Sequence, residues 1–460
     1  MYKRVNLTYL LERNEKMVLD ILNFSVGGYR NIAAAKLDLN KVTAIVGLNG
    51  YGKSNVISAI DFGIDFIKTP YKKNMMSHKN EIPLLKDFAG KDYSFEIEAR
   101  FDGIVFKYGY SFEWKTLLNK PKIKNEFLSI KTESGTNQYN TYIKRDGDYA
   151  LFKSSPKGRC DNSIEIKDDE LVINKLMNRD KLFYSDTIFE INNIEFYIEK
   201  HLDSAPSFQP DNVIFKLSGG LDDIKNIPRI IWEIKENNES KYRILKDTFM
   251  HIFPSVMDIE CREHSITNIG SIDIRDIMFS DNVYTLAVKD DRLTQPISFE
   301  NLSDGTRRVF LALTFAVLAD IKKLSVIVFE EPENSIHPSL LQIFLRALDK
   351  LSGNCKIVFT SHSPYMIQYM PLDSVYIGLR CNSGQVDFRR ITRPDTLIKH
   401  ASKHDQTIGD LIFSYLSFNN SNELLSGYIG EPAPGLIHNE NDLVFDEDDD
   451  WLNDNTENGV

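Results

Sequence analysis

The chain has 460 residues, of which 42% are apolar and 26% charged, and its net charge at neutral pH is −11. This length and composition are typical of a folded protein of two to four domains. The longest nearly apolar run, Val309–Ala319, is too short to span a bilayer, and the first residues form no hydrophobic signal region, so we expect a cytoplasmic protein without a membrane partner. The four cysteines are far apart and indicate neither a zinc site nor a disulfide framework.

Residues 1–114 are predicted to form the first lobe of an α/β domain. Alternating or continuous apolar runs predict its strands, and an apolar-faced helix is expected to begin at Ser54. The predicted strands are Val18–Phe24, Ala34–Asp38, Lys41–Val46, Tyr93–Phe101 and Ile104–Trp114.

Between the third strand and the helix, residues 47–54 read Gly-Leu-Asn-Gly-Tyr-Gly-Lys-Ser, a complete G-x-x-x-x-G-K-[ST] phosphate loop. Its glycines let backbone N–H groups turn inward around phosphate oxygens. Lys53 supplies a point charge for the β- and γ-phosphates and Ser54 a hydroxyl for Mg²⁺, while the N-terminus of the following helix favours an anion. The residues predicted to bind the nucleotide here are Gly47, Asn49, Gly50, Tyr51, Gly52, Lys53, Ser54 and Asn55.

Residues 115–290 are predicted to be a large α+β insertion with helices at 171–202 and 222–252. Basic and aromatic residues alternate in its first part, which is typical either of a DNA-binding surface or of a solvated lysine-rich surface, and both interpretations stay open. The basic residues are Lys115, Lys120, Lys122, Lys124, Lys144, Arg145, Lys153, Lys157 and Arg159. The aromatic residues are Tyr139, Tyr142, Tyr149 and Phe152.

Residues 291–400 return to a regular alternation of strands and helices and are predicted to be the second lobe. Val309–Leu318 is expected to be a buried helix. Leu324–Phe329 and Lys356–Thr360 have the apolar character of central parallel strands, with Leu340–Lys350 as the helix between them.

Polar residues stand at the ends of these elements. Ser303 and Gly305 precede the buried helix, where N–H groups and a hydroxyl can meet an anion. Glu330 and Glu331 end one strand and point differently, so that Glu330 can face Mg²⁺ while Glu331 orients a water for attack on the γ-phosphate. His362 follows the next strand, at the sheet edge where α/β ligands bind, and can hydrogen-bond the γ-phosphate or the attacking water. The predicted catalytic residues are therefore Glu331, His362 and Lys53, and the predicted metal ligands are Ser54 and Glu330.

The phosphate loop and the segments around Ser303, Glu330 and His362, in this order, resemble the ABC-type ATPase heads of RecF, of the structural-maintenance-of-chromosomes proteins and of the OLD-like ATPases of bacterial anti-phage systems. The resemblance covers about residues 17–110 and 290–385. It implies a P-loop ATPase head with a mixed sheet and flanking helices, ATP and Mg²⁺ as ligands, and Arg30 and Asn31 as contacts to the base and sugar. In such heads the signature segment, here with Ser303 and Gly305, covers the ATP of another head, which implies a head-to-tail dimer.

The sequence departs from the family pattern at three points. Glu330 stands where the Walker B aspartate is usual, a replacement that also occurs in OLD-like members. No Q-loop glutamine is evident after Phe101, and no acidic constellation of a Toprim nuclease follows His362. The resemblance therefore implies the OLD-like ATPase without its nuclease half.

Residues 401–460 are predicted to be a C-terminal extension, disordered from about residue 430. Nine acidic residues lie within 439–460, which holds no basic residue, so the remainder of the chain is nearly neutral and its acidity does not exclude a nucleic-acid partner. The acidic run, bracketed by Phe445 and Trp451, is either solvated disorder or a docking peptide for a basic partner.

Two function classes remain. The first is an ATPase sensor or scaffold of an anti-phage complex that acts with a separately encoded nuclease or toxin, similar in plan to Septu-type systems. The second is a RecF-like ATPase of DNA repair or recombination that loads on DNA without a toxic partner. A transporter ATPase subunit is disfavoured by the missing Q-loop and the large insertion.

Overall fold

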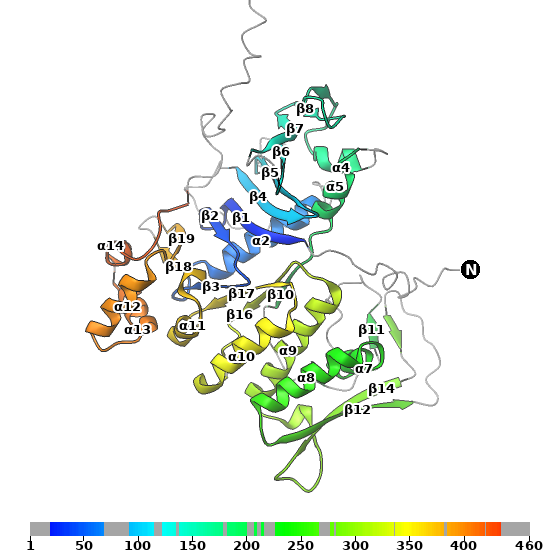
Figure 1. Cartoon of the computed structure of the whole chain (residues 1–460), viewed down its shortest axis with the longest axis vertical. Coiled ribbons are helices and arrows are strands. Elements are labelled where there is room, and N and C mark those ends of the chain that lie inside the picture. Colours follow the sequence, from blue (N-terminus) through cyan, green and yellow to red (C-terminus); the bar gives the residue numbers. More distant parts are fainter. Residues whose placement is uncertain are drawn as a thin grey trace, which may run out of the picture.

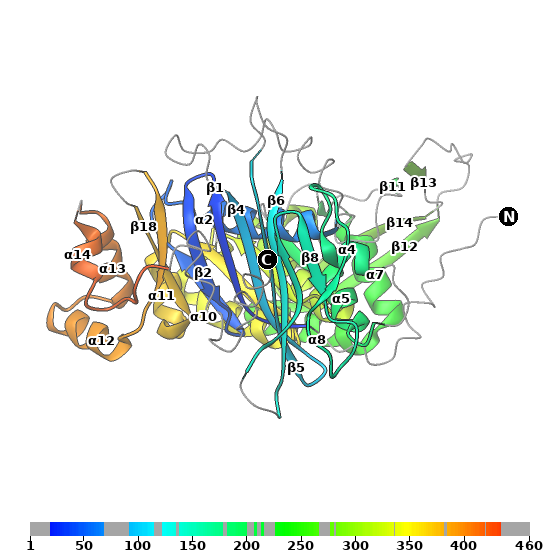
Figure 2. The ribbon, with the colours of Figure 1, turned by 90° about the horizontal axis from the view of Figure 1, so that it is seen from above.

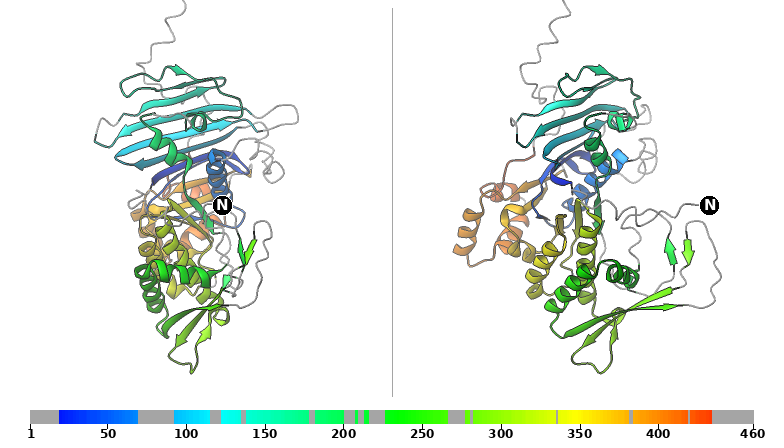
Figure 3. Two further views of the ribbon diagram at one scale, coloured as in Figure 1. Left: turned by 90° about the vertical axis from the view of Figure 1, so that its right-hand side faces the viewer. Right: turned by 45° about the vertical axis from the view of Figure 1, so that its right-hand side comes forward.

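The computed structural model describes residues 19–68, 92–114, 122–134, 138–177, 182–199, 207–208, 213–215, 226–265, 277–279, 282–334, 336–380, 384–418 and 420–433. Within these residues one 14-stranded sheet runs through the protein (Figure 1). Its order is β10-β16-β17-β3-β18-β19-β2-β1-β4-β5-β6-β7-β8-β9. The sheet has a parallel part, which carries the predicted nucleotide site, and an antiparallel part (Figure 3).

The parallel part consists of the first five strands in that order, and each of them runs parallel to its neighbours. The bounds are β10 Phe196–Glu199, β16 Val326–Glu330, β17 Lys356–Ser361, β3 Val42–Val46 and β18 Val375–Arg380. Because side chains alternate along a strand, these apolar segments bury both of their faces. Ile327 and Ile357 pack on the side of α9 (Asp304–Lys322) and α10 (Pro338–Leu351), whereas Val328 and Val358 pack on the side of α2 (Lys53–Lys68).

The antiparallel part, in which only β19 and β2 pair in parallel, continues from the first lobe into the predicted insertion, so the two share one sheet (Figure 2). Its strands are β19 Val386–Arg390, β2 Ile32–Asp38, β1 Asp20–Tyr29, β4 Tyr93–Phe101, β5 Ile104–Phe112, β6 Ile123–Thr132, β7 Asn140–Asp146, β8 Tyr149–Phe152 and β9 Asn162–Ser163. Helix α2 packs against β1, β2 and β4. There Phe66 stacks on Tyr110 and Phe112 with ring centroids 5.0 and 4.7 Å apart, which joins the helix to the sheet through aromatic packing.

Two further groups of elements complete the structure. The rest of the insertion adds α4 Val172–Met177, α5 Ser185–Asn192, β11 Val213–Phe215, α7 Ile227–Asn237, α8 Glu239–Ile252, β12 Val256–Ser265 and β13 Ile277–Phe279. Then come β14 Asn282–Asp290, β15 Ile297–Ser298 and the 3-10 turn Phe299–Asn301. After the core follow α11 Pro364–Tyr369, the 3-10 turn Leu372–Ser374, α12 Pro394–Lys403, α13 Ile408–Leu416 and α14 Ser421–Leu425. Among the described residues, no helix combines the length and apolarity needed to cross a membrane.

The predicted helix over residues 171–202 is wrong in its second half. The structure ends α5 at Asn192 and forms the edge strand β10 at Phe196–Glu199, where Phe196 lies opposite Val326 of β16. Its aromatic and β-branched residues favour a strand once a partner edge is present. Residues 69–91 lie outside the described residues, as does the tail from residue 434 onward, which holds most of the disorder predicted from about residue 430.

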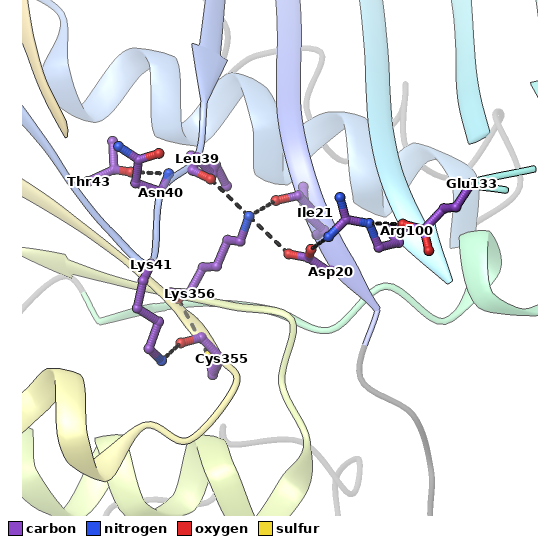
Figure 4. Close-up of polar contacts among 10 residues, drawn as sticks. All are labelled: Asp20, Ile21, Leu39, Asn40, Lys41, Thr43, Arg100, Glu133, Cys355 and Lys356. Atoms are coloured by element: carbon purple, nitrogen blue, oxygen red, sulfur yellow. Dashed lines mark hydrogen bonds and ion pairs between the residues drawn. The ribbon is translucent and has the colours of Figure 1, made fainter. Parts of the chain in front are cut away.

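The N-terminal ends of the central strands are fixed by two lysines (Figure 4). Lys356, at the start of β17, donates to the backbone oxygens of Ile21 (2.6 Å) and Leu39 (2.8 Å) and pairs with Asp20 (3.0 Å). Lys41, just before β3, donates to the backbone oxygen of Cys355 (2.5 Å). The contacts of Lys356 tie the parallel strands to β1, which belongs to the antiparallel part, and the contact of Lys41 ties the start of β3 to the start of β17.

Candidate nucleotide-binding site

The strand order explains why segments far apart in the sequence meet. β17 lies between β16 and β3, and all three run parallel. Glu330 is in register with Thr360, and Ser361 with Val46. The carboxyl ends of the three strands therefore share one sheet edge, where the phosphate loop, the two carboxylates of the β16 end and His362 all lie.

The phosphate loop turns sharply at two glycines. Gly50 and Gly52 have φ values of +79° and +70°, a region that L side chains rarely adopt. A Cβ on Gly52 would also lie 3.2 Å from the amide of Asn31. Only glycine therefore suits the conformation that this part of the loop takes.

Lys53 closes the loop from the first turn of α2. Its side chain is buried, with 6% exposed, and Nζ donates to the backbone oxygens of Gly47 (2.9 Å) and Leu48 (3.2 Å). Burial lowers the pKa of Lys53, although nearby carboxylates, Glu331 foremost, act to raise it. An ammonium held by loop carbonyls inside a glycine cradle fits a phosphate, which would supply stronger charged acceptors.

The proposed metal ligands are in contact with each other. Ser54 Oγ donates to Glu330 Oε2 at 3.3 Å, which joins the first turn of α2 to the end of β16. A hydroxyl and a carboxylate oxygen are donors that Mg²⁺ accepts, and a few protein ligands suffice because this ion keeps several waters. This donor pair fits a magnesium ion held beside the phosphates.

Glu331 occupies an unusual backbone conformation, with φ +48°. Its N–H donates to the backbone oxygen of Thr360 (2.9 Å), Asn334 Nδ2 donates to Oε2 (3.0 Å), and His362 Nδ1 lies 3.1 Å from Oε1. Burial acts to raise the pKa of Glu331, but the Asn334 hydrogen bond and the charges of His362 and Lys53 outweigh it, so this pKa is lowered. The carboxylate is thus ionised at neutral pH and can accept a proton or orient a water.

Two residues of this cluster, Asn334 and Glu333, received no role from the sequence. Asn334 orients Glu331, and Glu333 is buried with its carboxyl against Ser361. Their proximity to Glu331 in the run Glu-Glu-Pro-Glu-Asn is the only sequence signal. The contact between Glu333 and Ser361 of β17 could not be predicted from that signal.

Arg30 and Asn31 form the turn between β1 and β2, beside the phosphate loop. Arg30 Nη1 donates to Asn55 Oδ1 (2.8 Å), and Asn55 Nδ2 donates to Asn31 Oδ1 (2.7 Å). The Arg30 guanidinium lies over the ring of Tyr29, 5.6 Å from its centroid. The structure therefore brings both residues together with the start of α2, whereas Asn49 is exposed at the tip of the loop.

The signature segment caps a helix. Ser303 is the N-cap of α9 and its Oγ accepts from the backbone N–H of Thr306 at 3.3 Å. Asp304 pairs with Arg308 at 2.8 Å, and Ser303 and Asp304 are both exposed. Gly305 lies in the first helical turn. These contacts fix the helix end and leave the binding of a second head by Ser303 and Gly305 as a prediction.

Two of the basic and aromatic residues of the insertion, for which a DNA-binding surface and a solvated lysine-rich surface were both left open, do not lie on the surface. Arg145 is 2% exposed and donates to the backbone oxygens of Gly147 (2.9 Å), Glu170 (2.6 Å) and Lys167 (3.1 Å). Phe152 is buried in the core of the sheet. Both side chains serve the interior of the fold, so neither can contact a nucleic acid.

Other members of that surface are engaged in ion pairs. Lys122 pairs with Asp148 (2.7 Å) and Lys124 with Asp92 (3.0 Å). Tyr149 is 78% exposed and stays available to a partner. Lys115 and Lys120 lie outside the described residues.

The phosphate loop, the flanking strand and helix and the polar groups at the shared sheet edge define a P-loop ATPase-type domain. Residues 42–367 match the family described as "AAA domain, putative AbiEii toxin, Type IV TA system", and the chain belongs to this family. This match confirms the AAA ATPase group predicted from the motifs, and the sheet itself confirms the predicted fold class, a mixed sheet with flanking helices.

Two curated proteins are similar to the chain. Protein ea59 of Escherichia phage lambda is 30% identical over 118 residues, which are 24% of this chain and 22% of that protein. Endonuclease GajA of Bacillus cereus (strain VD045) is 23% identical over 360 residues, which are 76% of this chain and 56% of that protein. The match thus spans about a fifth of the length of Protein ea59 and about half of the length of GajA.

Among solved structures, the SMC head domain from Thermotoga maritima has a TM-score of 0.42 at 13% identity, covering 81% of this chain and 99% of that chain. The structure described as "recombination mediator protein RecF-ATPrS in RecFOR pathway" has a TM-score of 0.38 at 12% identity, covering 81% of this chain and 98% of that chain.

Proposed function

We propose that this protein binds ATP with Mg²⁺ and hydrolyses it to ADP and phosphate. The observation that carries the proposal is the meeting of Lys53, Glu330, Glu331 and His362 at the carboxyl ends of three adjacent parallel strands. A charged loop, a metal donor pair and an ionised carboxylate are the parts that phosphoryl transfer to water requires.

In the proposed reaction the glycine loop and Lys53 hold the β- and γ-phosphates, while Ser54 and Glu330 would hold Mg²⁺. A bound Mg²⁺ would neutralise phosphate charge and polarise the γ-phosphoryl group. Glu331 orients the attacking water and accepts its proton, and His362, 3.1 Å from Glu331, hydrogen-bonds the water or the γ-phosphate. Arg30 and Asn31 contact the base and sugar.

We further propose that two heads pair head to tail, with Ser303 and Gly305 of one head covering the ATP of the other. Both residues lie at the N-terminus of the 19-residue helix α9, and such a terminus favours an anion. ATP would then bind the paired state better than the single head and shift the population toward pairs.

Lys53→Ala tests the nucleotide site. Loss of a charged contact to phosphate costs about 1.5–3 kcal/mol, which is about a 10- to 100-fold weaker Kd for ATP. Calorimetry with Mg²⁺ measures this change, with Lys350→Ala on the exposed side of α10 as the matched control. Equal ATP affinity of Lys53→Ala and the control would contradict the site.

For the cellular role we propose the ATPase sensor or scaffold of an anti-phage complex with a separate nuclease or toxin. A family described by a putative toxin and a relative named endonuclease support this proposal. Co-expression with the neighbouring genes should lower phage plaque counts for the unaltered protein but not for Lys53→Ala. Sensitivity to DNA damage without phage protection would instead favour the RecF-like role in repair.

A further inference from the structure

The end of β16 and the turn after it carry three glutamates within four residues, and each has a different environment. Glu330 contacts Ser54, Glu331 lies beside His362, and Glu333 is buried with 8% exposed. A buried carboxyl is costly unless it makes specific contacts. The proposed metal site and the proposed base leave this third carboxyl unexplained.

We propose that Glu333 is a positioning residue for ATP hydrolysis, which holds Ser361 and thereby fixes the turn that presents Glu331 to the phosphate loop. This inference rests on the ATPase function proposed for the site.

Ser361 makes hydrogen bonds to three segments of the site. It is fully buried at the end of β17, and its Oγ donates to Glu333 Oε1 while accepting from the backbone N–H of Ser363 at 3.0 Å. Its backbone oxygen accepts from the N–H of Gly47 at 3.2 Å. One residue therefore joins the turn after β16, the segment that carries His362 and the first glycine of the phosphate loop.

The backbone conformation of Glu331, with φ +48°, explains why these hydrogen bonds are needed. A non-glycine residue in the left-handed region costs about 1–2 kcal/mol and persists only where neighbouring contacts enforce it. Thr360 holds the N–H of Glu331 at 2.9 Å, and the next residue, Ser361, holds the carboxyl of Glu333. Two consecutive residues of β17 thus hold the turn by hydrogen bonds. Removing one of these bonds lets the backbone of Glu331 leave the left-handed region.

The pKa values of the two glutamates shift in opposite directions. Burial raises the pKa of Glu333 even though the Ser361 hydrogen bond acts to lower it, while the pKa of Glu331 is lowered. Among the described residues, Glu333 Oε2 is buried without a hydrogen-bond partner. An amide of the same shape can accept the Ser361 hydrogen bond, so Glu333→Gln should keep the contact that Glu333→Ala removes.

The test compares steady-state ATP hydrolysis and ATP binding of the full chain in four variants: E333A, E333Q, S361A and the double variant E333A/S361A. Misplacement of a reacting group by about 1 Å can cost up to about 100-fold, so kcat should fall about 10- to 100-fold in E333A and S361A. The Kd for ATP should stay within about threefold, since the loss is confined to the transition state. E333Q should recover most of kcat, and the double variant should be no slower than S361A alone, since S361A already removes both hydrogen bonds of the Ser361 hydroxyl.

Three results would overturn the proposal. They are an E333A kcat equal to that of the exposed control Glu423→Ala, an E333Q that is as slow as E333A, and multiplicative losses in the double variant. If E333A does not fold, S361A and E333Q decide together, since S361A removes the Glu333 contact along with the bond from the N–H of Ser363, whereas E333Q keeps both. Failure of the ATPase proposal is distinguishable, because the unaltered protein would then show no hydrolysis at all.

Discussion

Replacing the proposed base tests the mechanism most directly. In Glu331→Gln an amide takes the place of a carboxylate of nearly the same shape. The side-chain oxygen can still accept from Asn334 Nδ2, now 3.0 Å from Oε2, so the turn keeps its conformation. What disappears is the negative charge beside His362 and Lys53.

The size of the effect follows from this geometry. The lowered pKa keeps Glu331 ionised at neutral pH, so the substitution removes a functioning acceptor rather than a protonated acid. General-base catalysis contributes about 10²- to 10⁴-fold, which corresponds to about 3–5 kcal/mol of activation free energy. ATP affinity should be retained, because the loop glycines and Lys53 are untouched and one negative charge near the triphosphate is lost.

The assay is steady-state phosphate release at saturating ATP, with ATP binding measured on the same preparation by calorimetry. Glu423→Gln, an exposed glutamate of α14, is the matched control for the change in charge. We expect Glu331→Gln to accumulate ATP-bound protein with little phosphate release. Turnover equal to that of the control, with ATP bound, would refute the role of Glu331.

Three further predictions concern stability. Burial raises the pKa of Glu126 to about 7, so the folded protein retains a proton that the unfolded chain releases near its ordinary value of about 4.3. The free energy of unfolding should therefore fall as pH rises from about 4.5 to 7, and Glu126→Gln should remove up to about 3 kcal/mol of this fall, as measured by urea unfolding at several pH values. Arg145→Ala removes the cation beside Glu126 and three bonds to backbone oxygens, and should lower the unfolding free energy by about 3–5 kcal/mol, against little change for the exposed Lys157→Ala. Lys356→Met leaves two backbone oxygens without their donor and should cost about 2–3 kcal/mol, measured in the same way. An unchanged pH dependence in Glu126→Gln, or an unchanged midpoint in Arg145→Ala or Lys356→Met, would contradict the assigned contact.

The core of the fold was predictable where a motif and an apolar strand coincide. β3 and α2 flank a phosphate loop whose spacing allows few alternatives, and β16 and β17 are short, mostly apolar runs that end in a polar or charged residue. β10 was missed because its four residues acquire strand character only through pairing with β16, in which each partner residue lies 130 positions further along the chain. Long-range pairing of this kind has no local signal.

The candidate site shows the same division. Lys53 and Glu331 were assigned from sequence because their chemistry is tied to motif positions. Glu333 and Ser361 were not assigned, because their contact depends on the register of β16 against β17 and on the turn after Glu331. Likewise Arg145 read as a surface cation, whereas three backbone oxygens hold it inside the fold.

The two ends of the parallel strands use charged side chains in opposite ways. At the N-terminal ends, Lys356 binds two backbone oxygens and one carboxylate, and these three contacts leave no donor of its ammonium group for a ligand. At the carboxyl ends, Lys53 rests on the carbonyls of its own loop, Glu331 sits in a strained backbone conformation, and Glu333 keeps one buried oxygen unpaired among the described residues. Such incompletely satisfied groups lower the stability of the empty protein and are expected where a ligand completes the contacts. ATP binding should therefore raise the unfolding temperature of the unaltered protein, and much less so that of Lys53→Ala.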